Sequence, residues 1–185
     1  MVEYEKLYNE VKAKMSERRF EHSEHVVKRA VEYAKIYNID INTVKLTAIA
    51  HDIAKELTNE EIQECTKKYN IKFDEIEQKN KSLIHAKLGS YICKNEYDFT
   101  EDMANAIKYH TTGRENMTIL EKIIYLADAT EETRTFCSKY TDLVKENIDK
   151  GIVEIQKFTI TKLLEENKLI HENSIKCYNY YLKLI

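Results

Sequence analysis

The chain has no proline and only three glycines among its 185 residues. These two residue types end helices and form tight turns, so their scarcity favours long helices rich in leucine, isoleucine, lysine and glutamate. Hydrophobic residues make up 43% of the chain, which is enough for one full core and too many for a disordered protein. The composition therefore predicts an all-α fold, with one domain spanning residues 1–185.

Apolar residues recur at helical spacing along most of the chain. A capping-box pattern at Thr58 and Glu61 marks the start of one short helix, whereas residues 70–80 are polar and predict a connector with at most a helical turn. No repeat or low-complexity segment interrupts the pattern. The expected helices cover 3–18, 22–37, a segment that follows Asp40 and includes His51 and Asp52, 58–69, 82–95, 100–110, 118–131, 142–167 and 174–184.

Charge, cysteine content and hydropathy exclude several functions. The net charge of −3 gives no general attraction to a nucleic-acid backbone. The four cysteines, Cys65, Cys93, Cys137 and Cys177, lie far apart and show no zinc or redox spacing, so we expect reduced thiols. The start is unlike a signal peptide, and no apolar run is long enough to span a bilayer. These features predict a cytoplasmic protein that binds neither nucleic acid nor membrane.

One apolar run ends in ionisable side chains. Leu46–Ala50 leads directly into His51 and Asp52, and Lys55 follows three residues later. Burying such groups without partners costs several kcal/mol, and packing gives no reason to place them there. A bound cation would be the missing partner, so the stretch indicates a metal-dependent hydrolase.

Other residues of the same chemistry lie on inward-facing helical stripes. One of them, His85, shares a face with Gly89, whose missing side chain leaves room beside the imidazole. A lone histidine on an apolar face is more often a hydrogen-bonded core residue, but a group is harder to explain in that way. The candidate ligands are His22, His51, Asp52, His85, His110 and Asp128.

Four imidazoles and two carboxylates without a thiolate suit first-row metals such as iron, manganese, zinc or cobalt, and suit calcium poorly. Six ligands exceed the needs of one tetrahedral ion, whereas two ions sharing Asp52 would use them all. Two divalent ions would leave a net positive site suited to phosphate oxygens. The same site would supply an activated water as the nucleophile.

Several short motifs follow one another in a recognisable order. They are Arg19–His22, Ala48–Lys55, Leu83–Gly89, Ala106–Arg114 with its continuation to Leu120, Ile124–Asp128, and Glu131 with Arg134. In this order they resemble the HD-domain phosphohydrolases, and most closely the YqeK-type branch of bacterial symmetrical diadenosine tetraphosphate hydrolases. The resemblance covers about residues 18–180, and the stretch His110–Arg114 is its most specific part.

The resemblance implies a single HD-domain helical bundle, with a metal-binding core at about 18–135 and C-terminal helices at about 141–185 packed on it. It also implies that diadenosine tetraphosphate is cleaved symmetrically to two ADP by a metal-bridging hydroxide, with ADP or GDP as the nucleotide product. The expected cofactor is a pair of divalent or mixed-valence first-row metal ions, with iron ahead of manganese, cobalt and zinc. In this interpretation Asp52 and Lys55 are catalytic, and the substrate-binding residues are Lys55, Thr111, Thr112, Gly113, Arg114 and Arg134.

Two positions depart from the family pattern. His25 stands one turn after His22, where a small residue is expected, and it is either a supporting group or a competing ligand. We place His22 ahead of it. The usual Glu-Pro after the last ligand is Glu131-Glu132 here, so the segment carrying Arg134 is expected to have a different shape.

Other functions stay open. The chain is compatible with an HD phosphohydrolase acting on mononucleotides or alarmones, although alarmone enzymes carry an acidic pair where this chain has Lys55 and Glu56. HD-GYP phosphodiesterases need a proline that the chain lacks. A non-catalytic nucleotide sensor would not need six ligands with basic residues nearby. The tyrosines on many helix faces are compatible with a homodimer.

Overall fold

A computed structural model describes residues 2–134 and 138–185. The prediction of an all-α fold is confirmed, because these residues form helices and no strand. The prediction for Cys137 and the expected core boundary at about 135 lie outside the described residues. The α-helices are α1 (Tyr4–Lys14), α2 (Glu17–Ile36), α3 (Ile41–Ala50), α4 (Asn59–Lys68), α5 (Glu75–Gln78), α6 (Lys81–Glu96), α7 (Glu101–Tyr109), α8 (Ile119–Thr130), α9 (Thr141–Glu146), α10 (Ile148–Glu165) and α11 (Glu172–Leu182), and one 3₁₀ turn, η1, covers Ser138–Tyr140.

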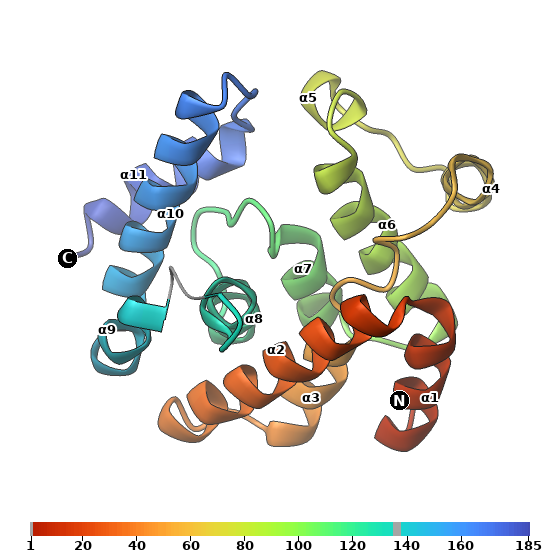
Figure 1. Cartoon of the computed structure of the whole chain (residues 1–185), viewed down its shortest axis with the longest axis horizontal. Helices are drawn as coiled ribbons and strands as arrows, with labels where there is room; N and C mark the ends of the chain where they lie inside the picture. The colour runs from red at the N-terminus through yellow and green to blue at the C-terminus, as the bar shows by residue number, and fades with distance from the viewer. Residues whose placement is uncertain (1, 135–137) are drawn as a thin grey trace.

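The helices surround a core in which α8 has a central place (Figure 1). Helix α2 packs against both α3 and α8, and α7 packs against α6 and α8. On the other side of α8, α10 and α11 form a pair that closes the molecule. The shared core is apolar and includes the fully buried Leu46, Ile107 and Ile124. This packing brings the C-terminal ends of α3 and α7 close to the facing sides of α2 and α8.

The segment 142–167 is two helices and not the single helix that its apolar stripe predicts. The break lies at Asn147, whose backbone is extended and whose side chain accepts hydrogen bonds from the backbone N–H groups of Asp149 and Lys150. A side chain that caps a new helix so well outweighs a continuous stripe. Gly151 then allows α10 to pass close to α9, because a Cβ there would lie 2.5 Å from Val144 Cγ2.

His51 and Asp52 also differ from the prediction of a continuous helix. Helix α3 ends at Ala50, and residues 51–56 form successive turns. Here the backbone hydrogen bonds join residues three apart, as in a 3₁₀ helix, from Ile53 N to Ala50 O and from Lys55 N to Asp52 O. The histidine and the aspartate therefore stand at the end of a helix, where their side chains can point toward neighbouring helices.

The connector at 70–80 contains the single turn of α5, capped by Asp74. The three cysteines in the described part of the chain, Cys65, Cys93 and Cys177, are not joined by disulfides. No helix in the described residues is both long and apolar enough to cross a membrane.

Candidate metal centre

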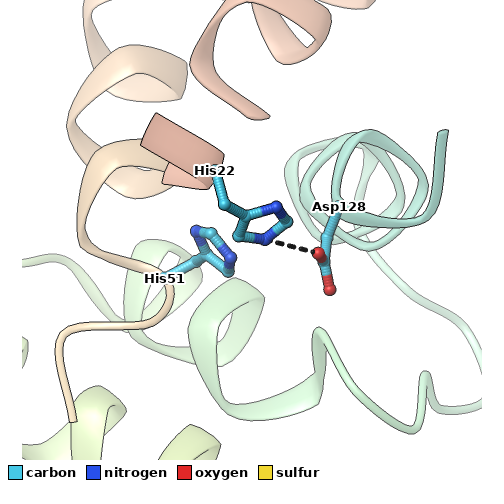
Figure 2. A group of neighbouring side chains, drawn as sticks. All are labelled: His22, His51 and Asp128. Carbon is cyan, nitrogen blue, oxygen red and sulfur yellow. Dashed lines mark ion pairs between the residues drawn. The ribbon is translucent and has the colours of Figure 1, made fainter. Parts of the chain in front are cut away.

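Three predicted ligands meet between α2, α3 and α8 (Figure 2). His22 comes from α2, His51 follows α3 and Asp128 lies near the end of α8. One ligand atom of each lies within 4.8 Å of those of the other two, and His22 Nε2 is 3.0 Å from Asp128 Oδ1. The arrangement is the size of a coordination sphere.

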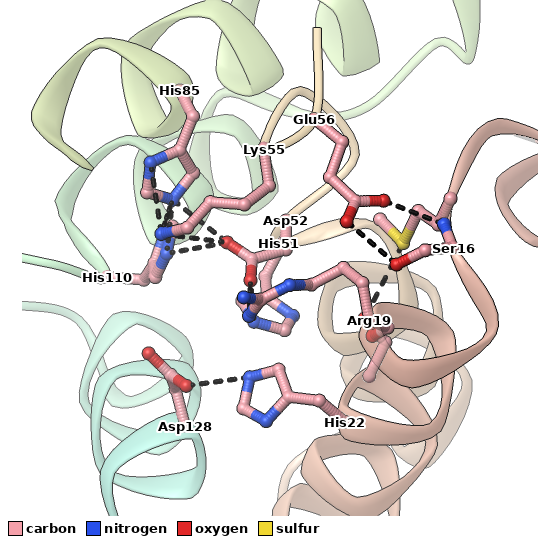
Figure 3. Close-up of polar contacts among 12 residues, drawn as sticks. Ser16, Arg19, His22, His51, Asp52, Lys55, Glu56, His85, His110 and Asp128 are labelled. Atoms are coloured by element: carbon pink, nitrogen blue, oxygen red, sulfur yellow. Dashed lines mark hydrogen bonds and ion pairs between the residues drawn. The ribbon is translucent and has the colours of Figure 1, made fainter. Parts of the chain in front are cut away.

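Asp52 lies at the centre of a second group, which shares His51 with the first (Figure 3). Its Oδ1 atom is 2.9 Å from His85 Nε2 and 3.5 Å from His110 Nε2. Its Oδ2 atom is 3.6 Å from His51 Nε2, so the carboxylate faces both groups. The fold thus brings all six candidate ligands together, although they come from five segments of the chain.

Hydrogen bonds to backbone carbonyls fix the proton positions on two imidazoles. His51 Nδ1 lies 2.7 Å from the carbonyl oxygen of Ala48, and His110 Nδ1 lies 2.7 Å from that of Ile107. A carbonyl oxygen only accepts, so Nδ1 carries the proton in both rings and Nε2 keeps its lone pair. His22 lies between two carboxylates, with Glu131 Oε1 3.3 Å from its Nδ1 and Asp128 Oδ1 3.0 Å from its Nε2. The free lone pairs point into the cluster.

The cluster leaves buried polar atoms without hydrogen-bond partners. They are His22 Nε2, His51 Nε2 and Asp52 Oδ1, all of which are acceptors in this arrangement. Acceptors that face one another repel, and an unsatisfied buried acceptor costs about 1–3 kcal/mol. A cation removes both penalties, so the residues present fit a bound metal ion.

Protonation favours metal binding as well. Burial lowers the pKa of both His51 and His85 to about 4, so both rings are neutral ligands at pH 7. Burial alone would raise the pKa of Asp52 and Asp128, but the surrounding imidazoles lower both well below the usual range. Two ionised carboxylates among neutral imidazoles form a negative site.

Three cationic side chains border the cluster. Lys55 Nζ is 3.8 Å from Asp52 Oδ1 and 3.3 Å from His85 Nε2, and burial lowers the pKa of Lys55. Arg134 Nη2 is 3.3 Å from Asp128 Oδ1. Arg19, which the sequence analysis did not select, donates from Nη1 to Asp52 Oδ2 at 3.0 Å. Its position one turn before His22 on the same helix was the signal that was available.

The other residues predicted to bind substrate have partners of their own. Arg114 pairs with the buried Glu121, with Nη2 2.8 Å from Oε2, and Thr112 Oγ1 donates to the carbonyl of Gly113. Gly113 has a φ of +64°, and its N–H donates to Tyr109 O. A Cβ at Gly113 would lie 2.6 Å from Cys177 Sγ, so the glycine lets α11 approach this loop. The substrate roles of Arg114, Thr112 and Gly113 stay predictions.

Two hollows open beside the cluster. The first measures about 480 Å³ and is lined by Arg18, Arg19, His22, His25 and Arg134, among others. The second measures about 570 Å³, lies between α8 and α10, and includes His110, Thr111, Asp128, Ile155 and Lys162. Arg134 and Thr133 line both hollows. His25 lines the same hollow as His22 and faces Glu132, with Nδ1 2.6 Å from Oε1.

A different group, Asp74, Glu77 and His171, also has the spacing of a metal site. Here, however, the atoms are already paired. His171 Nε2 lies 2.8 Å from Asp74 Oδ2, and its Nδ1 accepts from Asn173 N. Asp74 Oδ1 caps α5, and Glu77 Oε2 accepts from Asp74 N and pairs with Lys87. This group, which we call the α5–α11 clasp, joins two helices without needing an ion.

The fold of the protein and the side chains of the cluster agree with a known protein family. A family profile for the HD domain matches residues 19–133, more than half of the chain, and the protein therefore belongs to the HD domain family.

More particular relatives share almost the full length. A protein of Halalkalibacterium halodurans is 35% identical over 175 residues, covering 93% of each chain, and one of Staphylococcus aureus is 32% identical over 182 residues, covering 96% of this chain and 93% of the relative. Both are named "Bis(5'-nucleosyl)-tetraphosphatase, symmetrical". The crystal structure of a predicted HD superfamily hydrolase involved in NAD metabolism from Clostridium acetobutylicum is 32% identical and covers both chains completely, with a TM-score of 0.91. The resemblance to HD hydrolases that the motifs indicate is confirmed.

Proposed function

We propose that the protein is a metal-dependent hydrolase that cleaves a dinucleoside tetraphosphate symmetrically, with diadenosine tetraphosphate giving two ADP. The observation that carries the proposal is the convergence of six candidate ligand side chains, three of which have buried acceptor atoms without partners, beside two hollows lined by arginine and lysine. The names of the relatives support the same reaction.

In the proposed site, His22, His51, Asp52, His85, His110 and Asp128 hold two divalent or mixed-valence first-row ions, with iron as the first choice and manganese, cobalt or zinc as alternatives. When bound, such ions activate water and polarise phosphoryl oxygens. Asp52 has one oxygen toward each group of histidines, which suits it to serve both positions. The carbonyls of Ala48 and Ile107 keep the Nε2 atoms of His51 and His110 aimed at the centre.

In the proposed site, the cationic side chains neutralise the negative charge of the phosphates. Lys55 lies close enough to the cluster to contact a phosphoryl oxygen of the reacting group. Arg134 lines both hollows, so it is placed to contact the phosphate chain where it passes from one to the other. Arg19 lines the first hollow and holds Asp52 in place.

The two hollows beside the cluster support symmetrical cleavage. In the proposal, each hollow holds one nucleoside end, and the middle of the four-phosphate chain binds at the cluster. Water oxygen forms a bond to one of the two inner phosphorus atoms, and the bond from that atom to the central bridging oxygen breaks. The leaving nucleoside diphosphate keeps the bridging oxygen, the attacking water gives up a proton to solvent, and two nucleoside diphosphates result.

The test is product analysis. Purified protein is supplied with Mn²⁺ or, without oxygen, with Fe²⁺, and incubated with diadenosine tetraphosphate, and the nucleotides are separated by anion-exchange chromatography. ADP as the only product supports the proposal. AMP together with ATP, or no turnover despite tight nucleotide binding, contradicts it. Size-exclusion chromatography with light scattering of the same sample tests the expected homodimer.

A further inference from the structure

Glu131 places a carboxylate in the protein interior directly behind one metal ligand. Its side chain is fully buried and lies just beyond the end of α8, three residues after Asp128. It accepts hydrogen bonds from Thr133 N at 2.7 Å and Thr133 Oγ1 at 2.5 Å, and its Oε1 is 3.3 Å from His22 Nδ1. Burying a carboxylate costs free energy, so its position next to a candidate ligand requires an explanation.

The four imidazoles differ in the group that they contact away from the cluster centre. His22 contacts the Glu131 carboxylate, whereas His51 and His110 contact neutral carbonyls. His85 differs, because the Lys55 ammonium lies beside its ring, 3.4 Å from Nδ1 and 3.3 Å from Nε2, and not behind it. A carboxylate partner makes an imidazole a stronger electron donor to a metal, and a nearby cation makes it a weaker one. His22 is therefore the strongest donor of the four.

The other charges do not cancel this difference. Arg134 faces both Glu131 and Asp128, but half of its side chain is exposed, so solvent screens it more than the buried carboxylate. Arg19 contacts Asp52, which faces both groups of histidines. The position formed by His22 and Asp128 thus has a buried negative charge behind it that the position formed by His85 and His110 lacks.

We infer that Glu131 is a positioning residue that makes the His22–Asp128 position the tighter of the two metal sites. Through His22, it holds the proton on Nδ1 and directs Nε2 toward the ion. The site around His85 and His110 fills second and empties first. This inference rests on the metal centre of the proposed function and not on its substrate.

The test measures metal binding without nucleotide. Metal-free protein is dialysed against a series of Mn²⁺ concentrations, and bound Mn²⁺ is counted by atomic absorption. The wild type should bind two ions per chain with unequal affinity. Glu131→Gln should weaken the tighter class about 10–100-fold and leave the weaker class unchanged. The matched control is Glu132→Gln, because Glu132 is exposed and contacts only Lys28 and His25 among the described pairs, so both classes should stay as in the wild type.

Two further variants separate positioning from a general effect on folding. Glu131→Asp keeps the charge but withdraws it from His22, so the tighter class should weaken here too, while circular dichroism reports on helicity. In a His22→Gln background, Glu131→Gln should have no further effect on Mn²⁺ affinity. Equal affinities in the wild type, equal weakening of both classes, normal binding by Glu131→Asp, or an undiminished effect without His22 would each overturn the inference. Normal two-class binding by a protein that does not cleave diadenosine tetraphosphate would overturn the substrate assignment alone.

Discussion

Two groups of histidine and carboxylate side chains in this protein have similar spacing and different physical states. In the metal-centre cluster, His22, His51 and Asp52 keep buried acceptor atoms that have no partner. In the α5–α11 clasp, His171 is bonded through both ring nitrogens to Asp74 and Asn173. Residue type and distance are therefore alike in the two groups, and buried lone pairs without partners are what separates the candidate metal centre from the clasp.

The two groups also differ in how the chain builds them. The clasp is made largely of local contacts, with Asp74 capping its own short helix, and it recruits only His171 from far away. The metal-centre cluster needs five separate segments, and its histidines stand mainly on helix ends and packed helix faces. Its geometry therefore depends on the whole core. Substitutions in the core should disturb the metal-centre cluster more than the clasp.

We expect the largest effect when a charge is removed from the metal-centre cluster and activity is compared with the same change in the clasp. Asp52→Asn removes the charge shared by both groups of histidines, so kcat/KM should fall at least about 10³-fold, which is about 4 kcal/mol. Asp74→Asn in the clasp should leave kcat/KM close to the wild-type value. Steady-state kinetics with diadenosine tetraphosphate measures both, and circular dichroism checks that helicity is kept. Retained activity in Asp52→Asn would remove this residue from the mechanism.

Metal removal should have the next largest effect. An ion present at 100 times its dissociation constant stabilises the folded state by about 2.7 kcal/mol. For a chain of this size, its removal should lower Tm by roughly 5–10 °C. Thermal melting with and without chelator measures the change. His171→Ala protein should show the same chelator-dependent shift, and a Tm that does not respond to chelator in the wild type would contradict a bound stabilising ion.

The stability of the metal-free protein should depend on pH because of two buried histidines in the metal-centre cluster. The pKa values of His51 and His85 fall from about 6.5 unfolded to about 4 folded, so the unfolded chain binds more protons between these values. Stability is therefore fully present above about pH 6.5 and is lost as the pH falls toward about 4. Urea unfolding across this range measures the loss. His85→Gln should give a shallower dependence, and an equal slope would exclude His85 as a contributor.

The smallest expected effect concerns the clasp itself. His171→Ala breaks the contact with Asp74 and removes the side-chain cap of α11, which should cost about 1–3 kcal/mol of unfolding free energy. Turnover should stay close to wild type, because no clasp residue lies among the predicted ligands. Loss of activity in a folded His171→Ala protein would mean that the clasp supports the metal-centre cluster and is not independent of it.

Local pattern predicted much of this molecule. The absence of proline and the helical spacing predicted the helices, since both act over a few neighbouring residues. The same stripes selected His22, His51, Asp52, His85, His110 and Asp128, because ionisable groups are exceptional on apolar faces. The fold brings these six together, and their role as ligands stays a prediction, as does the single-domain organisation. The break at Asn147 was missed because one capping side chain outweighed the stripe around it.

The helical class and the chemistry of the candidate ligands could be predicted from the order of the amino acids, because both depend on residue type and short-range periodicity. Which charged side chains face those ligands depends on how the helices pack. This packing paired Arg114 with Glu121, and it brought Arg19 to Asp52 and Glu131 to His22. Glu131 and His22 are far apart in the chain and meet only because α2 packs on α8. An ion pair forms where helix packing sets the distance between two side chains, and no local pattern encodes that distance.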